Sequence, residues 1–246
     1  MGLTSRLVII LGLFILSGCA TVPDPAPPNL APSRDATEAR WQSTIAAERS
    51  VIADLERLNE TYDSLQKLTE QSAESELPIS LLRLVSMNCL NTEYGDGISG
   101  GAGLDGTSLS CRPAHFDRLQ TALADAPTAD QDLAMELLTM VDQVRILRGS
   151  LRMRLARLPR TITEHREFIA EERAMLRQLE SDLARRRTLY SSQGWRDVTQ
   201  LIADHRVLLR EFGDHLDALA EAYPAWPADV DTLVSQIYFD LSDMRH

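Results

Sequence analysis

The chain has 246 residues and a formal net charge of −11, with 36 acidic and 25 basic residues. A protein this acidic repels phosphate backbones, which argues against nucleic-acid binding. Aromatic residues make up only 5%, and the abundance of Leu, Ala, Glu, Arg and Gln favours helices over a β-sandwich or an array of βαβ units.

The N-terminus has a basic residue, a short apolar run and a cysteine. Arg6 precedes the apolar run, Leu7–Leu16, which is too short to span about 30 Å of hydrocarbon as a helix. Small residues then lead to Cys19. This pattern resembles a bacterial lipoprotein signal peptide, whose lipobox ends in the cysteine that becomes the lipid-modified first residue; an ordinary secretory signal is the alternative. Ala20, where inner-membrane retention usually has Asp, points to the outer membrane. The resemblance implies removal of residues 1–18 and an outer-membrane protein that faces the periplasm, anchored by palmitate and other acyl chains on Cys19.

Residues 19–33 follow as a lipidated cysteine and a Pro-rich tether. Residues 20–33 contain five prolines and almost no apolar periodicity. This composition predicts an extended, polyproline-like segment with a reach of up to about 40 Å, at about 3.1 Å per residue. We expect it to hold the folded domain, residues 34–246, away from the membrane.

Apolar residues recur every three or four positions through most of the remaining chain, which predicts helices. The first is expected to begin near Ser33 or Asp35, because Asp35 and Glu38 have capping-box spacing. A second capping box, Thr128 with Gln131, is expected to open a long helix. The remaining helices are expected over Pro78 to about Cys89, from Pro113, from Thr128 to Pro159, over Thr161–Tyr190 to a stop at Gly194, from there to Tyr223, and after the Tyr223–Pro227 turn.

The Thr161–Tyr190 segment has the heptad spacing of a coiled coil. Its apolar seam positions are Ile162, Ile169, Leu176, Leu183 and Tyr190, and the accompanying positions are His165, Glu172, Leu179 and Arg186. Helices of about 30 residues are about 45 Å long, and short connections make neighbours antiparallel. We therefore expect an all-α fold of elongated antiparallel helical hairpins, a coiled-coil-like bundle with one Gly-rich loop.

Two cysteines remain besides Cys19, and they form one even pair. In the oxidising periplasm, Cys89 and Cys111 are expected to form a disulfide that closes a loop of roughly 20 residues, worth about 3 kcal/mol. A metal site is the weaker alternative, because two thiols without nearby His or Cys partners do not make a zinc centre.

The segment Asn91–Ser110, inside this loop, has six glycines and no helical periodicity. We expect a mobile, exposed loop in which Tyr94 and Ile98 are the main groups able to dock, either on a partner or as part of an insertion without a role. Gly100–Asp105 matches the GGxGxD core of calcium-binding RTX repeats. A single copy cannot build the stacked calcium cage of those repeats.

Candidate catalytic and metal-binding residues are few. Glu74-Ser75 is similar to the Glu-Ser pair of lytic transglycosylases, in which the Glu is the general acid, but their following Gly-Leu-Met-Gln segment is absent. His165, His205 and His215 fall at or near seam positions, where they would bind a metal, sense pH, or simply pair with an Arg or Asp neighbour. No HxxxH, HExxH, nucleophile-elbow, Walker or dinucleotide motif accompanies them. We expect no catalytic residues, no metal ligands, no cofactor and no enzymatic activity.

The segment from about residue 80 to residue 190 has a distinctive layout. Leu82-Arg83 and Met87-Asn88-Cys89 lie on a short predicted helix, and Phe116, Leu119 and Leu123 precede the coiled coil. This layout resembles that of QseG-type outer-membrane lipoproteins. The chain departs from it in its Gly-rich insertion, in Cys111 and in its additional C-terminal helices. The resemblance implies an adaptor for a sensor histidine kinase of a two-component system.

We therefore expect a helical adaptor that binds another envelope protein through its long hairpin. Coiled-coil faces with mixed or apolar stripes are binding surfaces for further helices, which supports this expectation. A structural component of a secretion, efflux or cell-wall assembly is the alternative, and a peptidoglycan-acting enzyme is less favoured.

Overall fold

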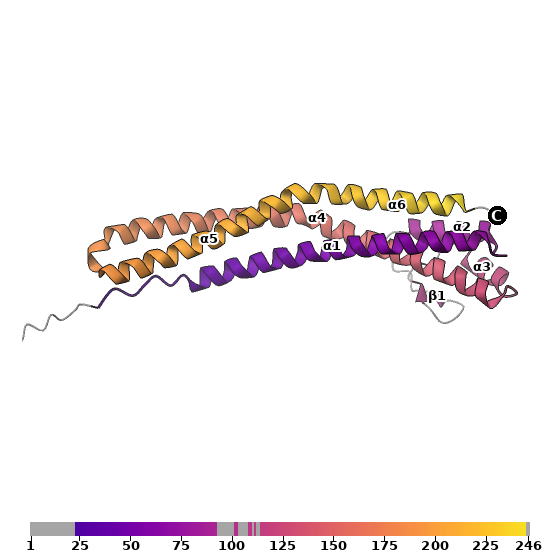
Figure 1. Cartoon of the computed structure of the whole chain (residues 1–246), viewed down its shortest axis with the longest axis horizontal. Coiled ribbons are helices and arrows are strands. Elements are labelled where there is room, and N and C mark those ends of the chain that lie inside the picture. Colours follow the sequence, from indigo (N-terminus) through magenta and orange to yellow (C-terminus); the bar gives the residue numbers. More distant parts are fainter. Residues whose placement is uncertain (1–22, 93–100, 103–107, 110, 112–113, 245–246) are drawn as a thin grey trace, which may run out of the picture.

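The computed structural model describes residues 23–92, 101–102, 108–109, 111 and 114–244, which form an elongated all-α protein (Figure 1). This confirms the predicted fold class. Three helical rods run along its length: α1 (Ala31–Ala73), α4 (Thr128–Arg185), and α5 (Ser192–Ala222) followed by α6 (Trp226–Asp243).

Smaller elements gather at one end of the rods (Figure 1). They are α2 (Ile79–Asn91), α3 (Phe116–Leu123) and a pair of two-residue antiparallel strands, β1 (Gly101–Ala102) and β2 (Ser108–Leu109), in which Gly101 lies opposite Leu109. The α4–α5 turn forms the other end, so the molecule has two chemically different poles.

Rods that are consecutive in the chain run antiparallel, as predicted, but one of the predicted hairpins, α5 with α6, does not form. α4 runs antiparallel to both α1 and α5: Asp54 of α1 pairs with Arg154 of α4 at 2.9 Å, whereas Arg166 of α4 pairs with Asp217 of α5. α5 and α6 do not form a hairpin. A 3-10 turn, Tyr223–Ala225, joins them without reversing the chain, because its residues keep helical backbone angles. α5 and α6 therefore lie end to end along α1 and α4.

α4 is one helix of 58 residues, and the predicted break at Pro159 is wrong. A proline inside a helix removes one backbone hydrogen bond and clashes with the preceding turn, at a cost of about 3 kcal/mol. Here buried side chains lie on both sides of it, with Leu155 and Leu158 before and Ile162 and His165 after. Burial against α1 and α5 offsets the local cost, so the helix continues for about 87 Å.

Several predicted helix boundaries also differ. α1 begins at Ala31 with Pro32 in its first turn and no side-chain cap, so Asp35 and Glu38 lie inside the helix. Likewise, Thr128 does not cap α4. Gly194 does not end a helix but lies in the first turn of α5, where its N–H donates to the N-cap Ser191 Oγ at 3.0 Å. Pro113 lies outside the described residues, and α3 begins three residues after it.

The part of the Pro-rich segment that the structure describes packs against the rod. Leu30 is buried, and Asp24 accepts hydrogen bonds from the Ser191 backbone N–H at 2.7 Å and from its hydroxyl at 2.6 Å. These bonds lower the pKa of Asp24 below its ordinary value. The chain therefore enters the fold at the α4–α5 turn. The expectation of a free tether that reaches up to about 40 Å is wrong for this part of the segment, because it is docked on the rod. Within the described ranges, no helix is both long enough and apolar enough to cross a membrane.

Candidate functional site

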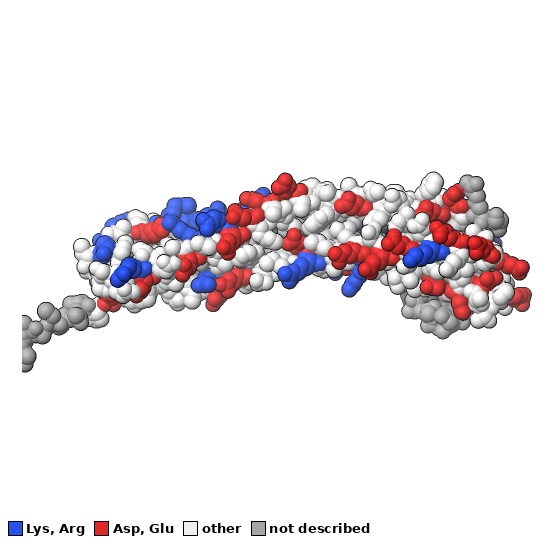
Figure 2. Space-filling model, viewed as in Figure 1, with Lys and Arg blue, Asp and Glu red and all other residues white. Residues whose placement is uncertain are grey.

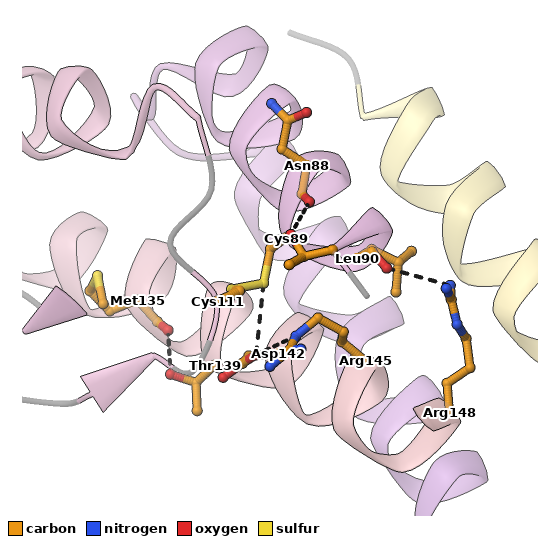
Figure 3. Close-up of a disulfide and its surroundings, with 10 residues drawn as sticks. Asn88, Cys89, Leu90, Cys111, Met135, Thr139, Asp142, Arg145 and Arg148 are labelled. Atoms are coloured by element: carbon orange, nitrogen blue, oxygen red, sulfur yellow. Dashed lines mark hydrogen bonds and ion pairs between the residues drawn. A yellow bond between two sulfur atoms is a disulfide. The ribbon is translucent and has the colours of Figure 1, made fainter. Parts of the chain in front are cut away.

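Cys89 and Cys111 form the predicted pair at the end that carries α2 and α3 (Figure 3). Their Cα atoms are 5.5 Å apart, within the normal range for a disulfide, and both side chains are buried. The bond ties the last turn of α2 to the segment that follows β2. A disulfide sulfur is not a thiolate, so neither cysteine can bind a metal in this form.

A buried ion pair on α4 lies beside the disulfide (Figure 3). Arg145 Nε donates to Asp142 Oδ1 at 2.9 Å, and both residues are buried. Asp142 Oδ1 also lies 3.9 Å from Cys89 Sγ. This is a contact and not a hydrogen bond, because the oxidised sulfur has no proton. Within the described part of the chain, Cys89, Cys111 and Asp142 are the one group placed to share a metal, and the disulfide removes two of these ligands.

Most of the predicted Gly-rich loop, including Tyr94 and Ile98, lies outside the described residues. Its described parts are β1 and β2, and Leu109 of β2 is buried. Leu109 therefore packs into the protein itself, although the sequence names only Tyr94 and Ile98 as groups able to dock. Its position two residues before Cys111, which the predicted disulfide fixes, is the feature that indicates this. Of the RTX-like segment, only Gly101 and Ala102 are described, and they form β1.

The three seam histidines lie in separate layers among α1, α4 and α5. Each ring contacts hydroxyl or Glu side chains, and of the expected Arg or Asp neighbours His165 has Arg40. The partners are Ser33 and Glu172 for His205, Thr44 for His165, and Glu48 for His215, at 2.9 to 3.6 Å. The structure thus does not bring the histidines together into a metal site among the residues it describes.

His165 occupies the most apolar of these layers. Its ring lies 5.6 Å from that of Phe212, which in turn stacks on Trp41. Burial lowers the pKa of His165, the positive charge of Arg40 lowers it further, and Glu164 opposes both. The imidazole is therefore neutral near pH 7, and protonating it would cost the fold stability.

The apolar seam residues of the predicted hairpin are buried inside the bundle. Every member is at most 8% exposed: Ile162, Ile169, Leu176, Leu183 and Tyr190. These residues pack among the rods, so they do not offer a free stripe to a further helix.

A shallow surface groove lies instead between α1 and α6, toward the end away from the α4–α5 turn. Acidic side chains gather over this end of the molecule (Figure 2). α6 itself contains four Asp and no Lys or Arg. Two adjoining hollows, which share Asp240, are lined among others by Tyr62, Asp231, Phe239, Glu70 and Asp243.

Two aromatic side chains, Phe239 and Tyr62, line this groove with the acidic ones. Phe239 is 67% exposed, and Tyr238, the next residue on α6 but not part of the lining, is 41% exposed. On the opposite wall, burial raises the pKa of the Tyr62 phenol, and the charge and hydrogen bond of Asp240 raise it further. Tyr62 therefore stays protonated and able to donate to Asp240. Across the rim, Arg152 of α4 donates to Asp231 at 3.2 Å in an exposed pair.

The sequence pattern does not predict this groove. The last helix has one apolar stripe, and the structure buries its members Val230, Ile237 and Leu241. Tyr238 and Phe239 lie off the stripe, and two adjacent aromatic residues off the apolar face of an amphipathic helix are the signal that was available.

Two candidate residues from the sequence remain, Glu74 and Cys19. Glu74 is the exposed C-cap residue of α1, whereas a general acid acts from inside a cleft that excludes water. Cys19 lies outside the described residues. No protein-family model matches the sequence, and comparisons with curated proteins and with solved structures find no match.

Proposed function

We propose that the chain is an outer-membrane lipoprotein, acylated on Cys19, and a non-enzymatic periplasmic adaptor that binds another envelope protein in the groove between α1 and α6. The observation that carries this proposal is the separation of the two poles. The chain enters the fold where Asp24 meets Ser191, and the groove lies toward the opposite end.

The distance between the two poles follows from the lengths of the helices. Ser191 and Phe239 are 48 residues apart along α5 and α6, which run end to end, and a helix rises 1.5 Å per residue. The groove therefore lies about 70 Å from the point where the tether meets the rod. An anchor at one pole and a recognition surface at the other suit a protein that reaches across the periplasm.

The chemistry of the groove indicates the kind of segment it holds. The exposed Phe239 supplies apolar contact area, and aromatic residues are typical binding hot spots. Asp240 and Asp243 line the groove with negative charge, and Asp231 lies at its rim in the pair with Arg152. The occupant we propose is a helix with apolar residues on the side that enters the groove and Lys or Arg at its edges, a helix-in-groove mode of binding. Complementary charge would speed the encounter and select this partner over acidic ones.

The groove replaces the long hairpin as the proposed docking surface, because the hairpin's apolar seam is buried. The resemblance to QseG-type lipoproteins would make the partner a sensor histidine kinase. A neighbouring gene pair for a kinase and a response regulator would favour that class over a structural assembly.

Photo-crosslinking in living cells tests the proposal. A photoreactive residue replaces Phe239 in the groove, and matched probes replace the exposed Met175 on α4 and Val207 on α5. We expect a protein adduct from position 239 and much weaker adducts from the two hairpin positions. Adducts from the hairpin alone would refute the groove. An absence of protein adducts at every position, together with binding to peptidoglycan fragments, would refute the adaptor.

Anchoring has its own test. Cys19→Ala should abolish uptake of labelled palmitate and release the protein from the membrane fraction. If the variant is still acylated and sediments with membranes, the lipoprotein assignment is wrong.

A further inference from the structure

The α4–α5 turn differs in charge from the rest of the chain. The fourteen residues from Leu183 to Arg196 include four Arg and no acidic residue. The four are Arg185, Arg186, Arg187 and Arg196, all exposed. At the same turn, Leu189 is 59% exposed, one of the most exposed large apolar side chains among the described residues.

Contacts between aromatic and Arg side chains hold the turn in a defined conformation. The Arg187 guanidinium stacks over the Trp195 ring at 4.8 Å and donates to the Tyr190 carbonyl oxygen at 3.3 Å. The Tyr190 and Trp195 rings meet edge to face, with their centroids 6.2 Å apart. Arg side chains over aromatic rings, beside an exposed Leu, are the residue types that lie at the boundary between lipid headgroups and acyl chains.

The nearby carboxylates do not cancel this charge. Asp182 lies 3.5 Å from Arg185, Asp24 accepts from Ser191, and Asp197 accepts from Gln193 at 2.7 Å. Counting these groups gives four guanidinium groups and three carboxylates, of which Asp182 is paired with Arg185. The turn is positive overall, although the chain without its first 18 residues has 36 acidic and 24 basic residues.

The tether brings this turn to the anchor. Four residues lie between Cys19 and Asp24, so the path has five residue-to-residue steps and is at most about 18 Å long at ~3.6 Å per step. Gly194 makes room for the docked segment, because a Cβ atom there would overlap the Asp24 carboxylate. A chain acylated on Cys19 therefore cannot place the α4–α5 turn far from the bilayer, whereas α4 extends about 87 Å away from it.

We propose that the α4–α5 turn is a second membrane contact, in which Arg185, Arg186 and Arg187 bind anionic phospholipid headgroups of the anchoring leaflet and Leu189 enters the interface. Clusters of basic residues close to an anionic surface bind it electrostatically, and an anchor with two signals holds more firmly than one. This contact would limit tilting of the rod and point the α1–α6 groove away from the anchoring membrane. It rests on the proposed acylation of Cys19 but not on the identity of the partner.

The test uses the full-length acylated protein in vesicles of phosphatidylethanolamine with phosphatidylglycerol, and in vesicles of phosphatidylcholine alone. Thr188→Cys supplies a labelling site for an environment-sensitive fluorophore beside Leu189, and Ser235→Cys supplies the same label on α6. The label at 188 is expected to be quenched by brominated lipids in the anionic vesicles, at least threefold more than in the neutral ones. The label at 235 should not be quenched in either.

Variants identify the groups responsible. Arg185→Gln/Arg186→Gln/Leu189→Ser should lose most of the quenching at 188, and 0.5 M salt should reduce it. The matched Arg157→Gln/Arg210→Gln variant, on exposed positions away from the turn, should keep it. Unchanged far-UV circular dichroism shows that each variant is folded.

The outcomes separate this inference from the proposed function. Protein that floats with both kinds of vesicle while the label at 188 stays unquenched would refute the second contact and leave the anchor intact. Equal quenching in both kinds of vesicle would refute recognition of anionic lipid. Protein that fails to float with either would refute the acylated anchor, and the second contact with it.

Discussion

Removing the Cys89–Cys111 disulfide should lower the free energy of unfolding by about 3 kcal/mol. The two cysteines are 22 residues apart, and closing a loop of that size in the unfolded chain costs about 3 kcal/mol of conformational entropy in the chain-entropy model. The loop contains six glycines, so its unfolded form is unusually free, and the bond removes much of that freedom. Cys89→Ala/Cys111→Ala avoids leaving a buried thiol beside Asp142. Urea unfolding followed by circular dichroism measures the change.

Reductant provides the control for this prediction. Dithiothreitol should destabilise the wild-type protein by a similar amount and leave the double variant unaffected, because only the wild type has a bond to reduce. Mass spectrometry of the non-reduced protein should find the Cys89 and Cys111 peptides linked. Quantitative alkylation of both cysteines without reductant, or an equal effect of reductant on both proteins, would contradict the reasoning.

Three further predictions concern the rods. Leu176→Ala should lower the free energy of unfolding, measured in urea, by about 3 kcal/mol because Leu176 is fully buried. Met175→Ala, at a 39% exposed position, should change it by less than about 0.5 kcal/mol. Equal effects of the two substitutions would place the seam at the surface. Because the pKa of His165 is lowered in the fold, the unfolded chain takes up the proton first, so stability should fall as the pH drops from about 7 to 5, by up to about 1.4 kcal/mol per pH unit; a His165→Asn variant with the same pH dependence would contradict this. Ser191→Ala removes the side-chain cap of α5 and the hydroxyl hydrogen bond to Asp24, and it keeps the hydrogen bond from the backbone N–H to Asp24. The variant should lose about 1 kcal/mol of stability in thermal unfolding; an unchanged melting temperature would show that the cap does not matter.

The sequence predicted the parts of the fold that depend on periodic burial. The seven-residue spacing from Ile162 to Tyr190 correctly identified buried positions, because one apolar stripe must face the other rods. The pairing of Cys89 with Cys111 followed from having two cysteines left in a chain that the N-terminal segment predicts to be exported. The buried positions follow from the spacing of apolar residues within one helix, and the disulfide follows from the number of cysteines. Neither inference needs to know which helices are neighbours.

Predictions that relied on local stop signals were less successful. Pro159 favours a helix end locally, but burial of Leu158 and Ile162 on either side outweighs that preference. Gly194 was interpreted as a stop because glycine often ends helices. Its actual role is to leave space for the Asp24 carboxylate, a contact between residues 170 positions apart.

Most of the candidate site, the groove between α1 and α6, could not be predicted from the sequence. The groove needs Tyr62 of α1 beside Asp240 of α6, and no periodicity within either helix indicates that these two helices lie side by side. The aromatic pair Tyr238 and Phe239 was visible in the sequence but lies off the stripe that identified α6. Its exposure became informative only once the inward face of the helix was known.

The yield of the protein adduct from a photoreactive residue at position 239 tests the central claim most directly. We expect the full-length wild-type background to give one predominant protein adduct, and Asp231→Asn/Asp243→Asn to reduce its yield at least fivefold by removing charge at the groove. Asp197→Asn/Asp204→Asn, the matched change at exposed positions of α5, should leave the yield unaltered. An adduct that is insensitive to the groove substitutions, or no protein adduct at position 239 while hairpin probes give one, would contradict the account.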